Sequence, residues 1–200
     1  MEIYDKDIRP ILYNKFASLK EFISDESSLI IDELSVVDGA ARVDIAVVNG
    51  KLHGYEIKSE RDTLDRLPDQ IFFYNMVFDK MTIVISEKFL DKIKTIIPEW
   101  WGIYVISNNK NKIKLKIEKK AKINKYVQKD ALLTLLWKDE MIEFLEKIEI
   151  KKGVRTKTKD VLTHLIIQNF SLKEIKDFTK NKLKSRNIQR AVLISQLCDD

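Results

Sequence analysis

The sequence predicts an α/β protein with a mixed central sheet, followed by an all-helical C-terminal subdomain. Three observations support this prediction. Apolar residues recur at helical spacing near the start of the chain, in residues 5–23. Strand-type and helical segments then alternate as far as residue 118. From about residue 124 only helical patterns remain, so we place two units at 1–124 and 125–200.

The first elements lead directly into a hairpin. Residues 5–23 carry a single apolar stripe, and Pro10 lies early, where a first helical turn tolerates proline. Residues 29–34 have an extended pattern, and residues 36–39 supply a turn. The remaining predicted elements of the first unit are a helix over 67–78, a strand over 81–86, a helix over 87–97 and strands over 102–106 and 112–118. Four helices follow: one over 129–148, one that ends at 169, one that begins at 171 and one over 187–197.

Composition narrows the class of protein. The 200 residues are 44% hydrophobic, which is enough for a packed core. The single cysteine, Cys198, excludes an internal disulfide and a cysteine-based zinc site. No apolar run approaches the roughly 18 residues that span a bilayer. The charged N-terminus does not resemble a signal peptide. We therefore expect a cytoplasmic protein without a membrane partner.

Positive charge is concentrated in two segments. Residues 108–125 and 147–190 together carry a net charge of +16, whereas the whole chain carries +5. A basic flank beside an acidic body is typical of a polyanion-binding protein. The alternative is a lysine-rich surface that only contacts water.

The hairpin of residues 40–58 places charged side chains where a strand favours apolar ones. A two-residue turn would set Asp44 opposite Tyr55 and separate Asp44 from Glu56 onto opposite faces. A three-residue loop, or a bulge at Gly54, shifts the pairing by one residue and sets Asp44 opposite Glu56. We predict the shifted register.

Asp44, Glu56 and Lys58 then share one face, and their chemistry points to a metal site. Paired carboxylates are hard oxygen ligands that suit Mg²⁺ or Mn²⁺. Such an ion binds phosphate oxygens and lowers the pKa of a bound water. The Lys58 ammonium could position that water, and the Ile57 carbonyl is a further candidate ligand.

These residues resemble a known signature. Asp44, eleven further residues and then Glu56-Ile57-Lys58 are similar to the D…(D/E)xK motif of the PD-(D/E)XK nuclease superfamily. Gln70 and Tyr74, four residues apart on the next predicted helix, resemble the QxxxY element of its RecB-like and Cas4-like branch. Glu33 lies where many members have another acidic residue. The longer run VDIAVVNGKLHGYEIKSERDTLDRLPDQ resembles a group of small bacterial and phage-associated nuclease-like proteins.

The resemblance implies a restriction-endonuclease-like αβββαβ core and a Mg²⁺-dependent enzyme that hydrolyses phosphodiester bonds, most readily in DNA. It implies that Asp44 and Glu56, with Glu33, bind the metal, for which Mn²⁺ can substitute. Lys58 would steer the attacking water, and Gln70 and Tyr74 would support the site. The expected nucleic-acid contacts are Arg61, Arg66, Lys112, Lys114 and Lys116.

Two other functions remain open. The fold could serve as a catalytically silent module that binds nucleic acid or protein. Alternatively, the helical tail after about residue 124 could read DNA or bind a partner on an inert body. A homodimer is also open, because nucleases that cut both strands are often dimers.

Overall fold

The computed structural model describes residues 2–25, 27–109, 112–151 and 153–198, with side chains for all of these except 21, 109, 112 and 187–198. It has a six-stranded sheet in the order β1-β2-β3-β4-β5-β6. The strands are β1 (Leu29–Val36), β2 (Ala41–Val48), β3 (Leu52–Lys58), β4 (Lys80–Ser86), β5 (Gly102–Asn109) and β6 (Lys112–Lys119). The β3–β4 and β4–β5 pairs are parallel and the other pairs antiparallel. The predicted α/β class with a mixed sheet is confirmed.

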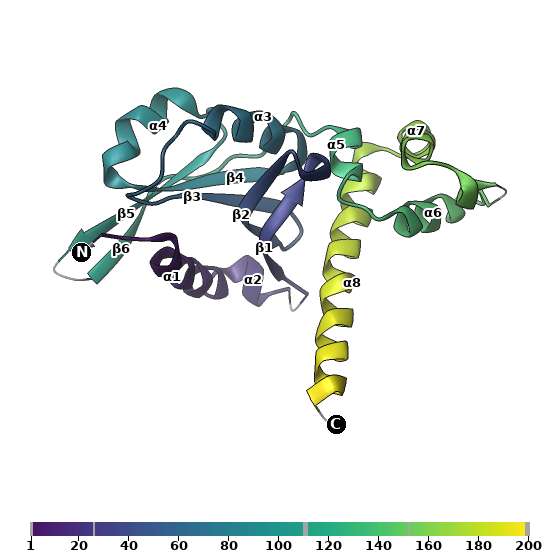
Figure 1. Cartoon of the computed structure of the whole chain (residues 1–200), viewed down its shortest axis with the longest axis horizontal. Coiled ribbons are helices and arrows are strands. Elements are labelled where there is room, and N and C mark those ends of the chain that lie inside the picture. Colours follow the sequence, from purple (N-terminus) through teal and green to yellow (C-terminus); the bar gives the residue numbers. More distant parts are fainter. Residues whose placement is uncertain (1, 26, 110–111, 152, 199–200) are drawn as a thin grey trace.

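Helices cover both faces of the sheet and continue beyond it (Figure 1). The helices are α1 (Asp5–Ala17), α2 (Lys20–Ile23), α3 (Leu67–Val77), α4 (Leu90–Ile96), α5 (Lys129–Leu133), α6 (Lys138–Glu146), α7 (Lys159–Asn169) and α8 (Leu172–Cys198). Short 3₁₀ turns lie at η1 (Val37–Gly39), η2 (Glu87–Phe89) and η3 (Val154–Thr156). None of the helices in the described ranges is long and apolar enough to cross a membrane.

Each face of the sheet buries its own core, because successive side chains of a strand point to opposite faces. On the face that α1 covers, Phe16 packs in one cluster with Tyr55. On the face that α3 and α4 cover, Ile93 packs in a second cluster with Ile83. A sheet buried on both faces needs apolar residues at nearly every position, which explains the continuous run MTIVIS of β4.

The helices after residue 124 share a core with the sheet. Leu132, Phe144 and Phe178 are buried in the same cluster as the α3 face of the sheet. The predicted division into 1–124 and 125–200 coincides with the end of the strands, since β6 ends at Lys119 and α5 begins at Lys129. Whether the two parts behave as separate domains stays a prediction.

One side of α8 docks on the body of the molecule through lysines spaced one helical turn apart. Each lysine contacts a different segment at the end of the sheet. Lys176 binds the Asp79 carboxylate at 2.7 Å, and Lys180 donates to the Gly50 carbonyl at 2.8 Å. Lys184 binds the Asp25 carboxylate at 2.9 Å. Beyond these contacts α8 extends away from the sheet (Figure 1).

The predicted helix bounds were wrong in three places. The stretch 5–23 forms two helices, α1 and α2, instead of one. The helix expected over 129–148 is broken into α5 and α6, because the Trp137 backbone N–H donates to the Glu140 carboxylate and starts a new helix there. The helices expected from 171 and over 187–197 form one helix, α8, since no glycine or proline interrupts residues 172–198. The capping box of Ser171 and Glu174 is present at its start.

Candidate functional site

The hairpin between β2 and β3 has the predicted shifted register. Its loop comprises three residues, 49–51, because Val48 pairs with Leu52. Gly50 in this loop has a φ of +89°, a conformation that favours glycine. The ladder continues to the Ile45–Tyr55 pair, and the same count brings Asp44 level with Glu56.

Gly54 does not form the bulge that was considered for it, since it pairs regularly with Ala46 and Met81. Its lack of a side chain serves packing instead. A Cβ atom at this position would lie 2.3 Å from the Met81 sulfur and 3.1 Å from the Phe78 ring. The loop alone therefore sets the register that aligns the two acids.

The Asp44 carboxylate takes over a position in the sheet where the backbone ladder ends. Its Oδ2 accepts a hydrogen bond from the Ile57 N–H at 2.6 Å. On its other side the β1–β2 pairing skips Glu33, whose φ is +54°. The strand changes face here, since Val43 lies in the α3-side core and Ile45 in the α1-side core. This kink opens the sheet beside the acid.

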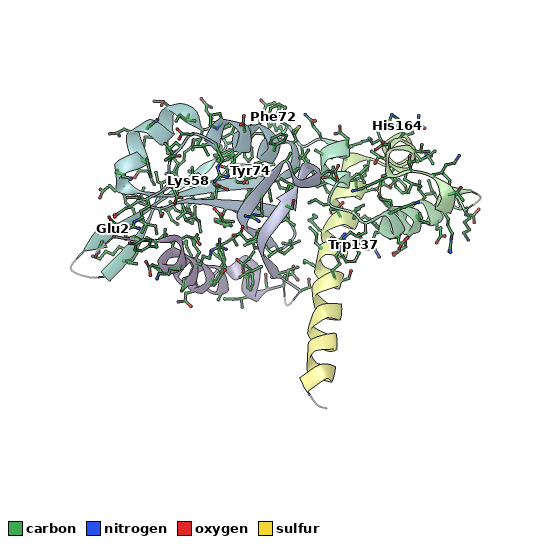
Figure 2. All side chains as sticks on the ribbon, in the orientation of Figure 1. Glu2, Lys58, Phe72, Tyr74, Trp137 and His164 are labelled. Atoms are coloured by element: carbon green, nitrogen blue, oxygen red, sulfur yellow. The ribbon has the colours of Figure 1, made fainter. Side chains whose placement is uncertain are left out.

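Glu56 lies at the centre of a buried polar cluster. Its residue is only 2% exposed. Oε1 accepts from the Lys58 ammonium at 2.7 Å and from the Gln70 amide at 2.6 Å, and the Tyr74 hydroxyl lies 2.8 Å from Oε2. Lys58 and Tyr74 approach each other from β3 and α3 in Figure 2. Two strands and one helix, β2, β3 and α3, thus bring together the five predicted site residues, Asp44, Glu56, Lys58, Gln70 and Tyr74.

A pocket of about 470 Å³ opens in front of these residues. Asp44, Glu56, Lys58 and Gln70 all line it, together with Glu33. The Gln70 Oε1 atom is buried and lacks a hydrogen-bond partner among the described residues. A buried carbonyl oxygen without a donor is unfavourable by about 1–3 kcal/mol, so this atom is suited to a cation or a bound water.

The electrostatics of the pocket favour uptake of positive charge. Burial, followed by the nearby Glu56 carboxylate, raises the pKa of Asp44 to about 7, although the Ile57 hydrogen bond opposes this shift. Burial and the same Glu56 charge raise the pKa of Tyr74, so its hydroxyl stays protonated. A divalent cation beside both acids would relieve their mutual repulsion.

Arg9 is a neighbour of the pocket that the sequence did not reveal. Its guanidinium binds the carboxylates of Asp5 (2.6 Å), Asp32 (3.1 Å) and Glu33 (2.6 Å), and the Asp44 carbonyl (3.1 Å). The sequence signalled only the pairing of Asp5 with Arg9, which are four residues apart on one helix face. That spacing does not indicate the contacts of Arg9 with the strands. Arg9 ties α1 to the kink at Asp44.

The other predicted residues have different surroundings. Glu33 lines the pocket, but Arg9 and Arg42 bind its carboxylate. Its role as a metal ligand stays a prediction.

Among the predicted nucleic-acid contacts whose side chains the structure describes, only Arg66 lines the pocket. Arg61 pairs with Glu2 and stacks on the Tyr4 ring instead. Lys114 and Lys116 are exposed on β6 at the far edge of the sheet, with Lys116 bound to Glu118, and the side chain of Lys112 lies outside the described part. Their predicted role is not tested by these positions.

The donor set fits a hard cation with few protein ligands. Within the described ranges, no group of three or more histidine, cysteine, aspartate or glutamate side chains is arranged to hold a metal. Mg²⁺ needs fewer, because it usually keeps several waters and binds one or two carboxylates. Asp44 and Glu56 supply the carboxylates, and Gln70 lines the same pocket.

Fold and pocket together define a mixed α/β protein with a buried and a half-buried carboxylate side by side at a kinked strand. The family model for bacteriophage P4 protein cII matches residues 5–197, so the chain belongs to that family. Protein cII of Enterobacteria phage P4 is 29% identical over 167 residues, which are 84% of this chain and 62% of that protein. The chain therefore spans less than two thirds of that relative.

Among solved structures, the SPO1766 protein of unknown function from Silicibacter pomeroyi is similar with a TM-score of 0.37 and 17% identity. The match covers 64% of this chain and 84% of that chain. A TM-score at this level does not establish a shared fold.

Family membership corrects the PD-(D/E)XK interpretation. Over nearly its whole length the chain matches the phage P4 cII family and not a nuclease family, so the assignment to the nuclease superfamily and the nuclease function were wrong. The physical reason is that Asp44, Glu56 and Lys58 form a short arrangement, two acids and a lysine on a hairpin. Unrelated chains can produce it.

Proposed function

We propose that the protein binds nucleic acid and that Mg²⁺ held between Asp44 and Glu56 contributes to this binding. One observation carries the proposal. The carboxylates of Asp44 and Glu56 line the same pocket, in a protein whose net charge is +5. A protein of positive net charge that nevertheless concentrates acids in one hollow is suited to a cation there.

Mg²⁺ in this pocket would neutralise the two acids and attract phosphate oxygens, which it prefers as ligands. Mn²⁺ has similar preferences and should substitute. The chain itself arranges the acids. Lys58, Gln70 and Tyr74 fix the Glu56 carboxylate, and the Ile57 N–H fixes that of Asp44.

Basic side chains supply the rest of the expected interface. Arg66 is exposed at the rim of the pocket and has no ion pair recorded within the described ranges. The basic segments 108–125 and 147–190 would add phosphate contacts that do not depend on base sequence. DNA is the first candidate ligand. We also place the protein in the cytoplasm, where nucleic acid and Mg²⁺ are both available.

Two more specific expectations, the type of fold and enzymatic activity, stay predictions. Apart from the short helix α2 and the turn η1, the order α1-β1-β2-β3-α3-β4 supports a core of the restriction-endonuclease-like type, as an arrangement of elements and without the nuclease activity. That the protein is an enzyme is likewise a prediction, and neither a reaction nor a turnover is assigned to the pocket.

The proposal is tested by titrating the full chain with Mg²⁺ and Mn²⁺ in a calorimeter. We expect Glu56→Gln and Asp44→Asn each to weaken cation binding at least about tenfold, because each removes a charged ligand. Glu99→Gln removes an exposed carboxylate outside the pocket and should bind as the wild type does. Fluorescence anisotropy of labelled DNA, with Mg²⁺ or with EDTA, then measures the coupling to nucleic acid.

In the anisotropy measurement, EDTA should weaken DNA binding by the wild type and have little effect on the two pocket variants. Two variants are needed because Glu56→Gln disturbs the Lys58 contact and could unfold the chain, whereas Asp44 is the more exposed acid. Unchanged cation binding in folded samples of both variants would refute the proposal.

A further inference from the structure

We infer that single-stranded nucleic acid lies in a groove leading from the Asp44–Glu56 pocket to the helical part of the chain, with an unpaired base stacked on Trp137. This inference rests on the proposed function and deepens it. It names the class of nucleic acid and the surface that binds it.

The groove consists of two hollows that adjoin along β1. The first is the pocket of about 470 Å³ that contains both acids. The second, of about 580 Å³, lies between β1 and η1 on one side and the start of α6 on the other. Glu33, Ser35 and Gly39 line both hollows, so the two share a wall.

Trp137 presents a large aromatic surface in the second hollow. It is 61% exposed, whereas Trp100 and Trp101 are buried at 8% and 0%. In Figure 2 its side chain lies beside α8, on the side of α6. The indole is well placed for stacking, which is how proteins that bind single strands hold successive bases.

The indole is also held in place. Its backbone N–H donates to Glu140 at 2.8 Å, and the Arg186 guanidinium lies 4.1 Å from the ring centroid. Arg186 is fixed in turn by Glu140 through Nε at 2.7 Å and by the Leu135 carbonyl at 2.9 Å. One face of the ring is thereby covered by a cation, and the exposed remainder is available to a base without a large loss of side-chain freedom.

The charges of the second hollow favour phosphate. Its two acids are already bound by cations, Glu33 by Arg9 at 2.6 Å and Asp38 by Lys159 at 3.2 Å. Lys138 is exposed beside Trp137 and has no ion pair recorded within the described ranges. The hollow therefore retains positive charge, while the adjoining pocket becomes compatible with phosphate once Mg²⁺ is bound.

These features select a single strand over a duplex. An indole stacks on the face of a base, and a duplex hides those faces between its base pairs. A duplex could use only the cations of the groove. Trp137 thus distinguishes the two forms.

The test compares Trp137→Leu, Trp137→Phe and a control, Tyr126→Leu, in the full chain. Tyr126 is 70% exposed and does not line either hollow. Anisotropy titrations with Mg²⁺ use a labelled oligothymidine and a duplex of equal length. We expect Trp137→Leu to weaken oligothymidine binding at least about fivefold, because a stacked base contributes that much. Trp137→Phe should stay within about twofold of the wild type, and Tyr126→Leu and all duplex titrations should be unchanged.

The outcomes separate this inference from the proposed function. Unchanged oligothymidine binding by Trp137→Leu overturns the inference, and so does equal weakening for the duplex and the single strand. If Glu56→Gln and Asp44→Asn lose binding while Trp137→Leu keeps it, the cation pocket stands and only the groove is wrong. If the wild type binds no oligonucleotide, both proposals fail and the groove serves another kind of partner.

Discussion

The charge of Asp44 depends strongly on its surroundings. Burial and the Glu56 carboxylate raise its pKa from 3.8 to about 7, so the folded chain without a cation binds a proton more tightly than the unfolded chain does. Its contribution to stability is therefore fully present below about pH 4 and is lost as the pH rises through 7. A bound cation would replace that proton.

This exchange predicts that cation affinity depends on pH. Below pH 7 a proton must leave Asp44 before Mg²⁺ binds, so affinity should rise about tenfold per pH unit between pH 5.5 and 6.5 and level off above about 7.5. Calorimetry at pH 6 in two buffers of different ionisation enthalpy should show release of about one proton per ion. Asp44→Asn has no such proton to release. Equal affinity at pH 5.5 and 7.5 would contradict this prediction.

At the residue scale, the sequence indicated the acids but not what surrounds them. Asp44, Glu56, Lys58, Gln70 and Tyr74 could be predicted to meet, because strand and helix periodicity set which side chains share a face. Arg9 was missed because its contacts join a helix to two strands that lie far from it in the sequence. The family was also misjudged, since a short motif reflects local geometry that unrelated chains can share.

At the scale of elements, strands were easier to predict than helix ends. The alternation in β6 and the apolar run of β4 arise from burial, which the sequence displays directly. The break before α6 depends on one hydrogen bond between Trp137 and Glu140, and no periodicity records it. In the hairpin, the predicted register, which aligns Asp44 with Glu56, was correct. Its cause was assigned partly to a bulge at Gly54, whereas the three-residue loop 49–51 sets it.

Gly54→Ala tests the packing role of that glycine. The added Cβ would lie 2.3 Å from the Met81 sulfur, and Met81 is fully buried, so the side chain has little room to move. We expect a loss of about 1–3 kcal/mol in the free energy of unfolding, measured in urea. In the Met81→Ala background the same change should cost less, because the clash is removed. Additive effects in the double variant would assign Gly54 to another role.

At the scale of the whole molecule, the helical part and the sheet are held together by a shared core and by α8. Leu132, Phe144 and Phe178 extend the core of the sheet into the helices. The buried Asp79 carboxylate binds Lys176 of α8 at 2.7 Å and also accepts the Leu52 N–H at 2.9 Å. Asp79 thus links β3, the start of β4 and the last helix.

Asp79→Asn tests this link. The substitution leaves the partly buried Lys176 ammonium without its counter-charge, so we expect a loss of about 1–3 kcal/mol in the free energy of unfolding. Asp177→Asn is the matched control, because Asp177 is exposed and Lys180 keeps its contact with the Gly50 carbonyl, so the loss should be at most about 0.5 kcal/mol. Unfolding in urea is followed by circular dichroism and by the fluorescence of Trp100 and Trp101, in a Trp137→Phe background that removes the exposed indole.

Because the core is continuous, the unfolding transitions measured by circular dichroism and by fluorescence should coincide in every variant. Separate transitions would mean that the parts before and after residue 124 fold independently, and that the groove between them is not rigid.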